Sequence, residues 1–213
     1  MVPRKYVLKF LDFFIFYSRF KYDEIKYSLF NIIKRGDFVK IETDRLIIRS
    51  FKMSDDADLY EMCSDPLTAY NAGWSPHDSI KITRNIILGY IYADETYAII
   101  LKERKKLIGT ISLYKNNIRK DSNVRELGFC LNKIYRNNGL MSEAVGAILD
   151  YGFNNMSLDL ITICHHDKNN ACRGLVKKFP FVYEGTLRMY RRLCDGTMVD
   201  AMMYSMKKEE FWR

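Results

Sequence analysis

The sequence has 213 residues, of which 48% are hydrophobic and 28% are charged, proportions that predict one globular domain with room for an added segment. The net charge is +8, but residues 1–40 hold nine Lys or Arg against four Asp or Glu, which leaves +3 for the remainder. A main body this mildly basic argues against direct nucleic-acid binding, which requires clustered Lys and Arg with interleaved aromatics. The dense basic spots after residue 40 are residues 102–106 and 188–192, which we interpret as solvated turns or strand edges.

The cysteines and histidines argue against a disulfide-bonded protein and against a metal-binding protein. The five cysteines form no Cys-x-x-Cys pair, and their odd number and irregular spacing are typical of a reduced, cytoplasmic protein. His165 and His166 are adjacent but His77 is remote, so a metal site would need ligands from unmatched places. We expect no metal.

Residues 1–40 form a segment of different character. Its run VLKFLDFFIFYSRF is interrupted by Lys9 and Asp12, is too short to span a membrane, and lacks a signal-peptide cleavage site. Apolar residues at steps of three or four predict two amphipathic helices in this N-terminal extension. The aromatic side chains of these helices must be buried, and we expect them to pack within the protein or in a homodimer. The alternatives are burial in a membrane surface or against a partner, or a poorly ordered tail.

Residues 41–213 are predicted to form the main domain, with residues 37–41 as a linker before it. The pattern begins with the strand LIIRSF, a helix capped by Ser54 and closed by Asp65-Pro66, the turn-rich loop NAGWSPHDS and a helix over residues 80–92. Three strands follow, TYAIIL, LIGTISLY and VRELGFCL, which we expect to form an antiparallel meander. A helix to about residue 154, the strand LITICH, a helix over residues 170–179 and two last strands complete a mixed α/β (α+β) sheet.

The stretch YRNNGLMSEAV, which follows the third of these strands, has the features of an anion site. A helix N-terminus leaves about four N–H groups without partners and carries roughly half a positive charge. Asn137, Asn138 and Gly139 can adopt positive φ and turn successive N–H groups toward one concavity, and Arg136 adds a fixed charge. A phosphate ester fits such a site, although the same turn can also be an ordinary loop.

A set of collinear motifs resembles the GNAT acyl-CoA N-acetyltransferase superfamily, and within it the branch of the ribosomal-protein-alanine N-acetyltransferases. The motifs are ETDRLIIRSF, the GWSPH loop, RELGFCL with the Arg-x-x-Gly-x-Met-Ser-Glu-Ala stretch, NNACRGLVKKFPFVYEG and EGTLRMY with DGTMVDAMMYSM. They cover residues 41–208. The resemblance implies a seven-stranded, mostly antiparallel GNAT sheet flanked by helices, and acetyl-CoA as cosubstrate.

The resemblance also implies which residues hold the cofactor. The loop at residues 136–142 would bind the pyrophosphate of acetyl-CoA; its members are Arg136, Asn137, Asn138, Gly139, Leu140, Met141 and Ser142. The main chain of Cys130 and Leu131 would bind the pantetheine arm like an added strand, and Asn169 would lie against the cofactor.

The sequence departs from the family pattern at four places. Met141 replaces a usual Gly or Ala, where only a backbone N–H is needed. Lys178-Phe179-Pro180-Phe181 replaces Lys-Leu-Gly-Phe, so the turn there must form without a glycine at positive φ. Val176 stands where many members carry a general-acid tyrosine, and Cys172 stands where this branch often carries a serine.

The chemistry of acetyl transfer suggests catalytic candidates. The acceptor amine must lose a proton, for which a carboxylate is an economical base, and Glu126 lies on the same strand face as Cys130. The alternative for Glu126 is a surface salt bridge. Backbone N–H groups near Cys130 and Leu131 would stabilise the oxyanion, and Cys172 or water would protonate the thiolate, although Cys172 can also be a core filler. Glu143 is better explained by the helix dipole than by catalysis.

Trp74 and His77 would line the acceptor side by resemblance, with core packing as the alternative for Trp74. The leading hypothesis is an N-acetyltransferase that acts on a primary amine, either a protein N-terminus, such as that of a ribosomal protein, or a small molecule. The alternatives are a non-catalytic CoA-binding module that recruits a partner through its N-terminal helices, and a ribosome- or membrane-docked protein that depends on residues 1–40. The acceptor is not defined by sequence.

Overall fold

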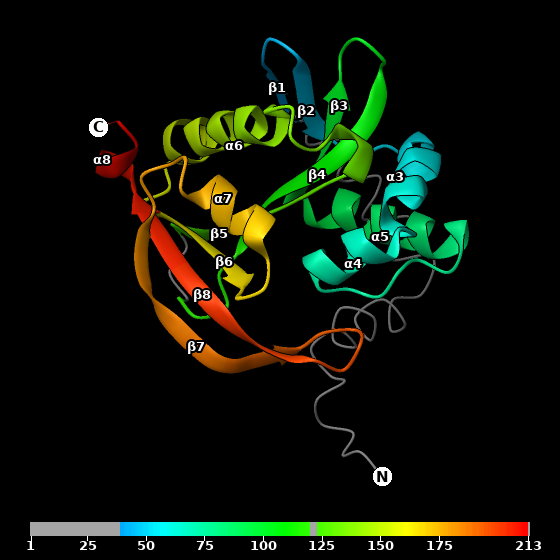
Figure 1. The fold of residues 1–213 in the computed structure, drawn as a ribbon. Helices are drawn as coiled ribbons and strands as arrows, with labels where there is room; N and C mark the ends of the chain where they lie inside the picture. Colours follow the sequence, from blue (N-terminus) through cyan, green and yellow to red (C-terminus); the bar gives the residue numbers. More distant parts are fainter. Residues whose placement is uncertain (1–38, 120–122, 213) are drawn as a thin grey trace. The chain divides into compact units, whose positions relative to one another are not determined.

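The computed structural model describes residues 39–119 and 123–212. The two helices expected in the N-terminal extension therefore lie outside the described residues, as does the expected burial of their aromatic face. Residues 38–213 form one compact unit around a single sheet (Figure 1).

The sheet has eight strands in the order β1-β2-β3-β4-β5-β6-β8-β7. All neighbours are antiparallel except β5 and β6, which run parallel. The mixed, mostly antiparallel architecture predicted from the sequence is thus confirmed. The strands are β1 (Lys40–Glu42), β2 (Leu46–Ser50), β3 (Thr96–Leu101), β4 (Lys106–Lys115), β5 (Val124–Leu131), β6 (Leu160–His166), β7 (Val182–Arg192) and β8 (Met198–Lys207).

Helices cover both faces of the sheet (Figure 1). Adjacent Leu107 and Ile108 of β4 belong to different buried clusters because successive strand residues point to opposite faces. The first cluster contains residues from α6 and α7, and the second contains residues from α3 and α5. The helical elements are η1 (Met53–Asp55), α3 (Asp56–Cys63), α4 (Pro66–Ala72), α5 (Ile80–Ala93), η2 (Lys133–Tyr135), α6 (Leu140–Asp150), the π-helical turn η3 (Tyr151–Asn155), α7 (Asn170–Val176) and α8 (Lys208–Phe211).

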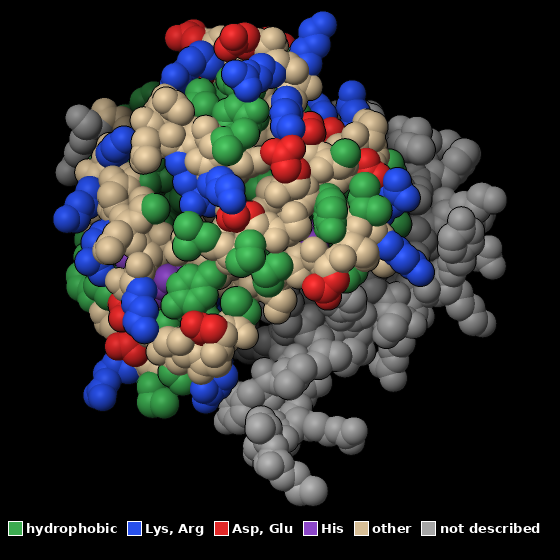
Figure 2. Space-filling model, turned by 45° about the vertical axis from the view of Figure 1, so that its right-hand side comes forward, with side chains coloured by type: hydrophobic (Ala, Val, Ile, Leu, Met, Phe, Trp, Pro, Cys, Tyr) green, Lys and Arg blue, Asp and Glu red, His purple; other side chains and the backbone are tan. Residues whose placement is uncertain are grey.

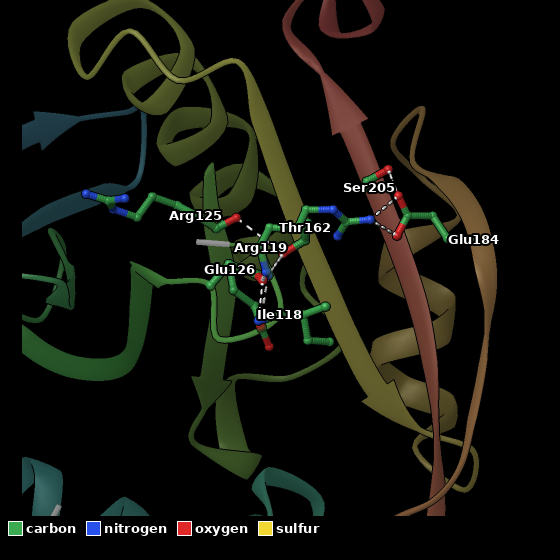
Figure 3. A network of polar contacts seen from close by, with 8 residues as sticks. Ile118, Arg119, Arg125, Glu126, Thr162, Glu184 and Ser205 are labelled. Carbon is green, nitrogen blue, oxygen red and sulfur yellow. Dashed lines mark hydrogen bonds and ion pairs between the residues drawn. The ribbon is translucent and has the colours of Figure 1, made fainter. Parts of the chain in front are cut away.

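Strands β5 and β6 pair along only part of their length. The register runs from Val124 opposite Leu160 to Glu126 opposite Thr162. Beyond this point β5 continues for five residues and β6 for four without pairing with each other, and the two strands diverge (Figure 3). One edge of the second half of β5 is therefore left open within the sheet.

The structure corrects two sequence expectations about the elements. The sheet has eight strands rather than seven, because Lys40 and Ile41, expected in a linker, pair with Arg49 and Ile48. Asp65-Pro66 follows the end of α3, as expected, but it also begins α4, where no helix was expected: the Asp65 carboxylate accepts from Thr68 N at 2.9 Å. Proline suits the first helical turn because its missing N–H would have no partner there.

The end of α7 follows the expectation for Lys178-Phe179-Pro180-Phe181. The helix ends at Val176, earlier than predicted, and Lys178 N and Phe179 N donate to carbonyls three residues back. Of the described residues with positive φ, none lies in this turn. The chain thus leaves α7 without the glycine that the family pattern would supply.

The charge distribution gives no large uniform patch on the face shown in Figure 2, where Lys and Arg side chains are interspersed with Asp and Glu. Among the described residues, no helix has both the length and the apolar character needed to cross a membrane.

Candidate active site

A cleft of about 520 Å³ lies at the open end of β5, between α4, the N-terminus of α6 and α7. The sequence-predicted cofactor residues and Cys172 line it, with the exception of Asn138. Thr68 and Asn71 of α4 and Lys178 after α7 also line it, and the sequence motifs did not indicate them. The fold thus brings together segments that lie about one hundred residues apart in the chain.

The loop before α6 has the backbone conformation that an anion site needs. Asn137 has φ 64° and Gly139 has φ 75°, whereas Asn138 is not among the residues with positive φ. Gly139 is the N-cap of α6, so the first N–H groups of an eleven-residue helix begin at the cleft. A Cβ on Gly139 would meet only Arg45 Nη2, at 3.5 Å, so glycine is favoured there by its φ rather than by lack of space.

Arg45 and Glu143 fix this loop from the outside. Arg45 Nε donates to Glu143 Oε2 at 2.6 Å, and Arg45 Nη1 donates to the Asn138 carbonyl at 2.9 Å. Glu143 Oε1 also accepts from Arg45 N at 2.9 Å and from the Thr43 hydroxyl. Burial alone would raise the pKa of Glu143, but these donors lower it below its ordinary value. Glu143 therefore joins the turn between β1 and β2 to α6, in addition to its place in the first helical turn.

Arg136 braces the cleft wall. Its Nε donates to the Leu131 carbonyl at 3.1 Å and its Nη2 donates to Thr68 Oγ1 at 2.8 Å. The guanidinium thus connects the end of β5 to α4, rather than standing free beside the helix N-terminus. Lys178 supplies a second cation at the cleft, with Nζ 3.3 Å from Ser142 Oγ.

The main-chain N–H and C=O of Cys130 do not face the open side of β5, contrary to the expectation from the sequence. Asn132 N donates to Ile108 O at 2.8 Å, so the alternation of the ladder turns the N–H and C=O of Cys130 toward β4. The groups of Phe129 and Leu131 then face the open side. The Leu131 carbonyl accepts from Arg136. The main-chain N–H and C=O of Phe129 and the N–H of Leu131 are therefore the groups directed at the cleft.

Asn169 and Cys172 form the opposite wall. Asn169 Oδ1 accepts from Cys172 N at 3.0 Å as the N-cap of α7, and Asn169 Nδ2 donates to the Asn71 carbonyl at 3.1 Å. This side chain therefore joins α7 to α4 at the cleft. Burial raises the pKa of the Cys172 thiol to about 12, so the thiol keeps its proton at neutral pH.

Glu126 lies in a buried polar network (Figure 3) rather than on the surface. Its side chain is 7% exposed, so the surface salt bridge considered from the sequence is wrong. Oε1 accepts from Tyr114 Oη at 3.2 Å and from Cys164 Sγ at 3.2 Å. Burial, and then the charge of Glu126, raises the pKa of Tyr114 well above its ordinary value, so the phenol remains a donor.

The same network fixes the paired end of β5 and β6. Asn116 Nδ2 donates to Thr162 Oγ1 at 2.7 Å and lies 3.4 Å from Glu126 Oε2. Arg119 reaches Glu184 of β7 at 2.6 Å, and Ser205 of β8 donates to the same carboxylate at 2.7 Å (Figure 3). Glu126 does not line the cleft itself; it lies four residues before Cys130, about 13 Å along the strand.

The two residues expected on the acceptor side do not line the cleft. His77 is 9% exposed and its Nδ1 lies 2.9 Å from Thr83 Oγ1 of α5, so it is a hydrogen-bonded core residue. Burial lowers its pKa. Trp74 packs against the cluster of α3 and α5, and its Nε1 is buried without a partner among the described residues.

A sheet parted between two parallel strands, with a helix N-terminus and a cleft at the parting, is the geometry of an acyl-CoA-dependent acyltransferase. Residues 45–182 match the family model for the acetyltransferase (GNAT) domain, and the chain belongs to the GNAT acetyltransferase family. It is therefore an acetyltransferase of the family that takes its acetyl group from acetyl-CoA.

Individual relatives agree with this assignment. The chain is 29% identical over 174 residues to the uncharacterized N-acetyltransferase p20 of Bacillus licheniformis, covering 79% of this chain and 96% of the relative. It is 33% identical over 147 residues to the uncharacterized N-acetyltransferase YnaD of Bacillus subtilis, covering 68% and 84%. A GNAT-family acetyltransferase from Bacillus anthracis superposes with a TM-score of 0.72 at 26% identity, covering 81% and 100%.

The fold also matches that of RimL, a ribosomal alpha-N-protein acetyltransferase solved in complex with coenzyme A. The TM-score is 0.69 at 19% identity, over 79% of this chain and 98% of that one. At this identity the likeness concerns the fold alone.

Proposed function

We propose that this chain transfers the acetyl group of acetyl-CoA directly to a primary amine, either of a protein N-terminus or of a small molecule. The observation that carries the proposal is the cleft of about 520 Å³ at the open edge of β5, which begins at the αL residue Gly139 and the N-terminus of α6. The solved complex of RimL with coenzyme A supports the same class of ligand.

The residues present fit the cofactor. The main-chain N–H groups of residues 139–142 would hold the diphosphate, as helix N-termini do, with Lys178 adding a charge beside Ser142. Arg136 acts by fixing the loop to β5 and α4. The open main-chain groups of Phe129 and Leu131 would pair with the pantetheine amides in the manner of an added strand, with Leu131 in the role expected from the sequence and Phe129 in that of Cys130.

Acetyl-CoA supplies an acetyl group activated as a thioester. Glu126 is the proposed base, acting directly or through a water, because its carboxylate is fixed by Tyr114 and Cys164 on the strand face that leads to Cys130. The Phe129 N–H, which faces the open side of β5 nearer to Glu126, is the proposed donor to the acyl oxygen, and the Phe129 carbonyl and the Leu131 N–H would serve the pantetheine amides. The carboxylate is held by hydrogen bonds made within the protein, so little reorganisation of the base is needed.

Two candidates remain for protonation of the leaving thiolate, Cys172 and water. A thiol with a pKa of about 12 is a poor donor to a thiolate whose own pKa is about 8.5, because the transfer is uphill by roughly 5 kcal/mol. We therefore favour water as the acid and Cys172 as a lining residue of the cleft.

The test is release of the CoA thiol from acetyl-CoA in the presence of a panel of peptides with free N-termini, polyamines and aminoglycosides. Turnover with at least one class, abolished in Glu126→Gln, is the expected result. CoA binding without turnover on any acceptor would instead support the non-catalytic CoA-binding module.

We also propose that the protein works in the cytoplasm. All five cysteines are free thiols, and four of them are buried or partly buried, as a reducing compartment allows. A homodimer remains a prediction from residues 1–40.

A further inference from the structure

The second half of β7 contains an irregularity that changes where its side chains point. The register with β8 shifts between Leu187 and Arg191, and Met189 adopts φ 50°, a conformation that residues other than glycine rarely take. The Met189 N–H donates to Asp200 Oδ1 at 2.7 Å, which holds the bulge in place. Met189 itself is 70% exposed, so the bulge is not explained by burial of its side chain.

The bulge directs Arg191 across the sheet to α4. The Arg191 guanidinium covers Gly73, the C-cap of α4, so closely that a Cβ on Gly73 would lie 2.6 Å from Arg191 Cζ. Figure 1 shows the far end of the β7–β8 hairpin curving toward α4. The basic spot at residues 188–192 was expected to be solvated, and Arg191 departs from that expectation.

Arg191 lies on the same face of the sheet as Glu126. Arg191 is opposite Val199, and residues Val199, Ala201 and Met203 of β8 alternate onto one face. Ala201 and Met203 are opposite His166 and Cys164 of β6, and Cys164 contacts Glu126. The side chains of Glu126, Cys164, His166 and Arg191 therefore lie in this order on one face of the sheet.

The side chains of Arg191 and His166, at the end of this face farthest from Glu126, carry hydrogen-bond donors that are available to a ligand. Within the described residues, the Arg191 guanidinium has no hydrogen bond or ion pair, although it is half-buried. His166 is 2% exposed, and neither of its ring nitrogens makes a hydrogen bond of standard geometry within the same part of the chain, although the Asn71 backbone interacts with the ring and opposes the lowering of its pKa. Burial, and then the charge of Arg191, lowers the pKa of His166, so the ring is neutral and keeps one N–H. A buried ring N–H without a well-formed hydrogen bond is costly unless a ligand satisfies it, and the half-buried guanidinium has donors available to the same ligand.

We propose that Arg191, with His166 beside it, binds a carboxylate of the acceptor, so that the substrate is an amine that carries a carboxylate on the same molecule. This inference rests on the proposed function and narrows its acceptor class. A guanidinium is suited to a carboxylate because it presents parallel N–H donors in a planar fork. Arg191 is then a specificity-determining residue that takes no part in the acetyl transfer.

The experiment compares acceptors matched except for charge: γ-aminobutyrate, ε-aminocaproate and short peptides with an acidic second residue, each against its amide counterpart. In the wild-type protein, kcat/KM for at least one carboxylate acceptor should exceed that for its amide by at least about tenfold. In Arg191→Gln the ratio should fall toward one through KM, with KM for acetyl-CoA unchanged. The small acids and the peptides distinguish a free amino acid from a peptide segment as the source of the carboxylate.

Two further variants exclude a structural explanation. Arg192→Gln removes the same charge from the next residue, whose Nη1 donates to Gly196 O at 2.6 Å, and should leave the ratio unchanged. Gly73→Ala keeps the charge of Arg191 but displaces its guanidinium, and should lower the ratio. Thermal unfolding checks that each variant is folded.

Failure of this inference differs from failure of the proposed function. Acceptors turned over with no preference for the carboxylate, or a preference that survives Arg191→Gln, would overturn the inference and leave acetyl transfer intact. If no acceptor is turned over, calorimetry measures whether the same carboxylate-bearing acceptors bind to the CoA-loaded protein. Binding lost in Arg191→Gln supports the carboxylate site, and no binding to the wild type overturns it.

Discussion

The phenol of Tyr114 donates to the carboxylate of Glu126 across two neighbouring antiparallel strands, with 3.2 Å between Oη and Oε1. The two residues are opposite each other in the ladder, so their side chains share one face. Cys164 reaches the same oxygen from β6, at the point where β5 and β6 stop pairing. The proposed base is thus held where the sheet opens.

Replacement of Glu126 by Gln should lower kcat by about 10²–10⁴-fold, the contribution typical of a general base, with CoA affinity nearly unchanged. The amide is close in size to the carboxylate but cannot accept the amine proton. Steady-state kinetics at saturating acceptor measures the loss. Glu61→Gln, a carboxylate on α3 that is bound by Lys106 and Asn132, is the matched control. Unchanged turnover in Glu126→Gln would remove this residue from the mechanism.

Replacement of Gly139 by Val should abolish CoA binding in a folded protein. A β-branched residue at φ 75° is strained by about 1–3 kcal/mol, so the loop would rearrange and the N–H groups would lose their common direction. Calorimetry with CoA measures the affinity. Gly146→Ala, in the middle of α6 where the nearest atom to a new Cβ is 4.0 Å away, should bind normally. Normal affinity in Gly139→Val would mean that the phosphate lies elsewhere.

Replacement of Cys172 by Ala should leave most of the turnover. Burial holds the pKa of this thiol at about 12, which is too high for efficient proton donation to a departing thiolate. The thiol side chain is small, so the change in packing is minor. A fall in kcat of the size expected for Glu126→Gln, without a change in the KM for acetyl-CoA, would instead identify Cys172 as the general acid.

Replacement of Glu143 by Ala should lower the free energy of unfolding by about 1–3 kcal/mol, because Arg45 and Thr43 lose a charged acceptor. The kcat at saturating substrates should change little, since this carboxylate faces the β1–β2 turn. Urea unfolding and steady-state kinetics on the same preparation separate the two effects. A large loss of kcat with unchanged stability would contradict this assignment.

The three histidines predict a loss of stability in mild acid. Burial lowers the pKa of His77, His165 and His166 in the folded protein, so the unfolded chain binds more protons than the folded one below its ordinary pKa of about 6.5. The free energy of unfolding should therefore fall with decreasing pH, by at most about 1.4 kcal/mol per pH unit for each histidine.

Urea unfolding between about pH 7.5 and about pH 5.5 measures this slope, above the range where most carboxylates titrate. His77→Gln should show a shallower slope, because Gln has no proton to gain and can still hydrogen-bond Thr83. Equal stability at both pH values in the wild type would contradict the buried, neutral state of these rings.

Local signals in the sequence predicted the elements that determine the fold class. The alternation in RELGFCL and the turn residues before α6 depend on neighbours in the chain, and both are present as β5 and as the positive φ of Gly139. Helix α4 was missed because Asp65-Pro66 follows one helix and also begins the next, and only the Asp65 cap reveals the second role.

The remaining parts of the site depend on contacts that no local pattern encodes. Arg136 appeared to be a free cation in the sequence, but its partners are Leu131 and Thr68, the second of which lies 68 residues away. The orientation of Arg191 follows from a bulge held by Asp200. In each case a pairing between distant segments determines whether a charged side chain is solvated, structural or available to a ligand.

The proposed cofactor site is tested most sharply by calorimetric titration of the wild-type chain with CoA and, separately, with pantetheine, which lacks the phosphates. The wild-type chain should show saturable binding of one CoA per chain, and binding of pantetheine that is weaker by at least about tenfold, because the N–H groups at the start of α6 lose their anion. No binding of CoA, or equal affinity for both compounds, would contradict the proposed cofactor site.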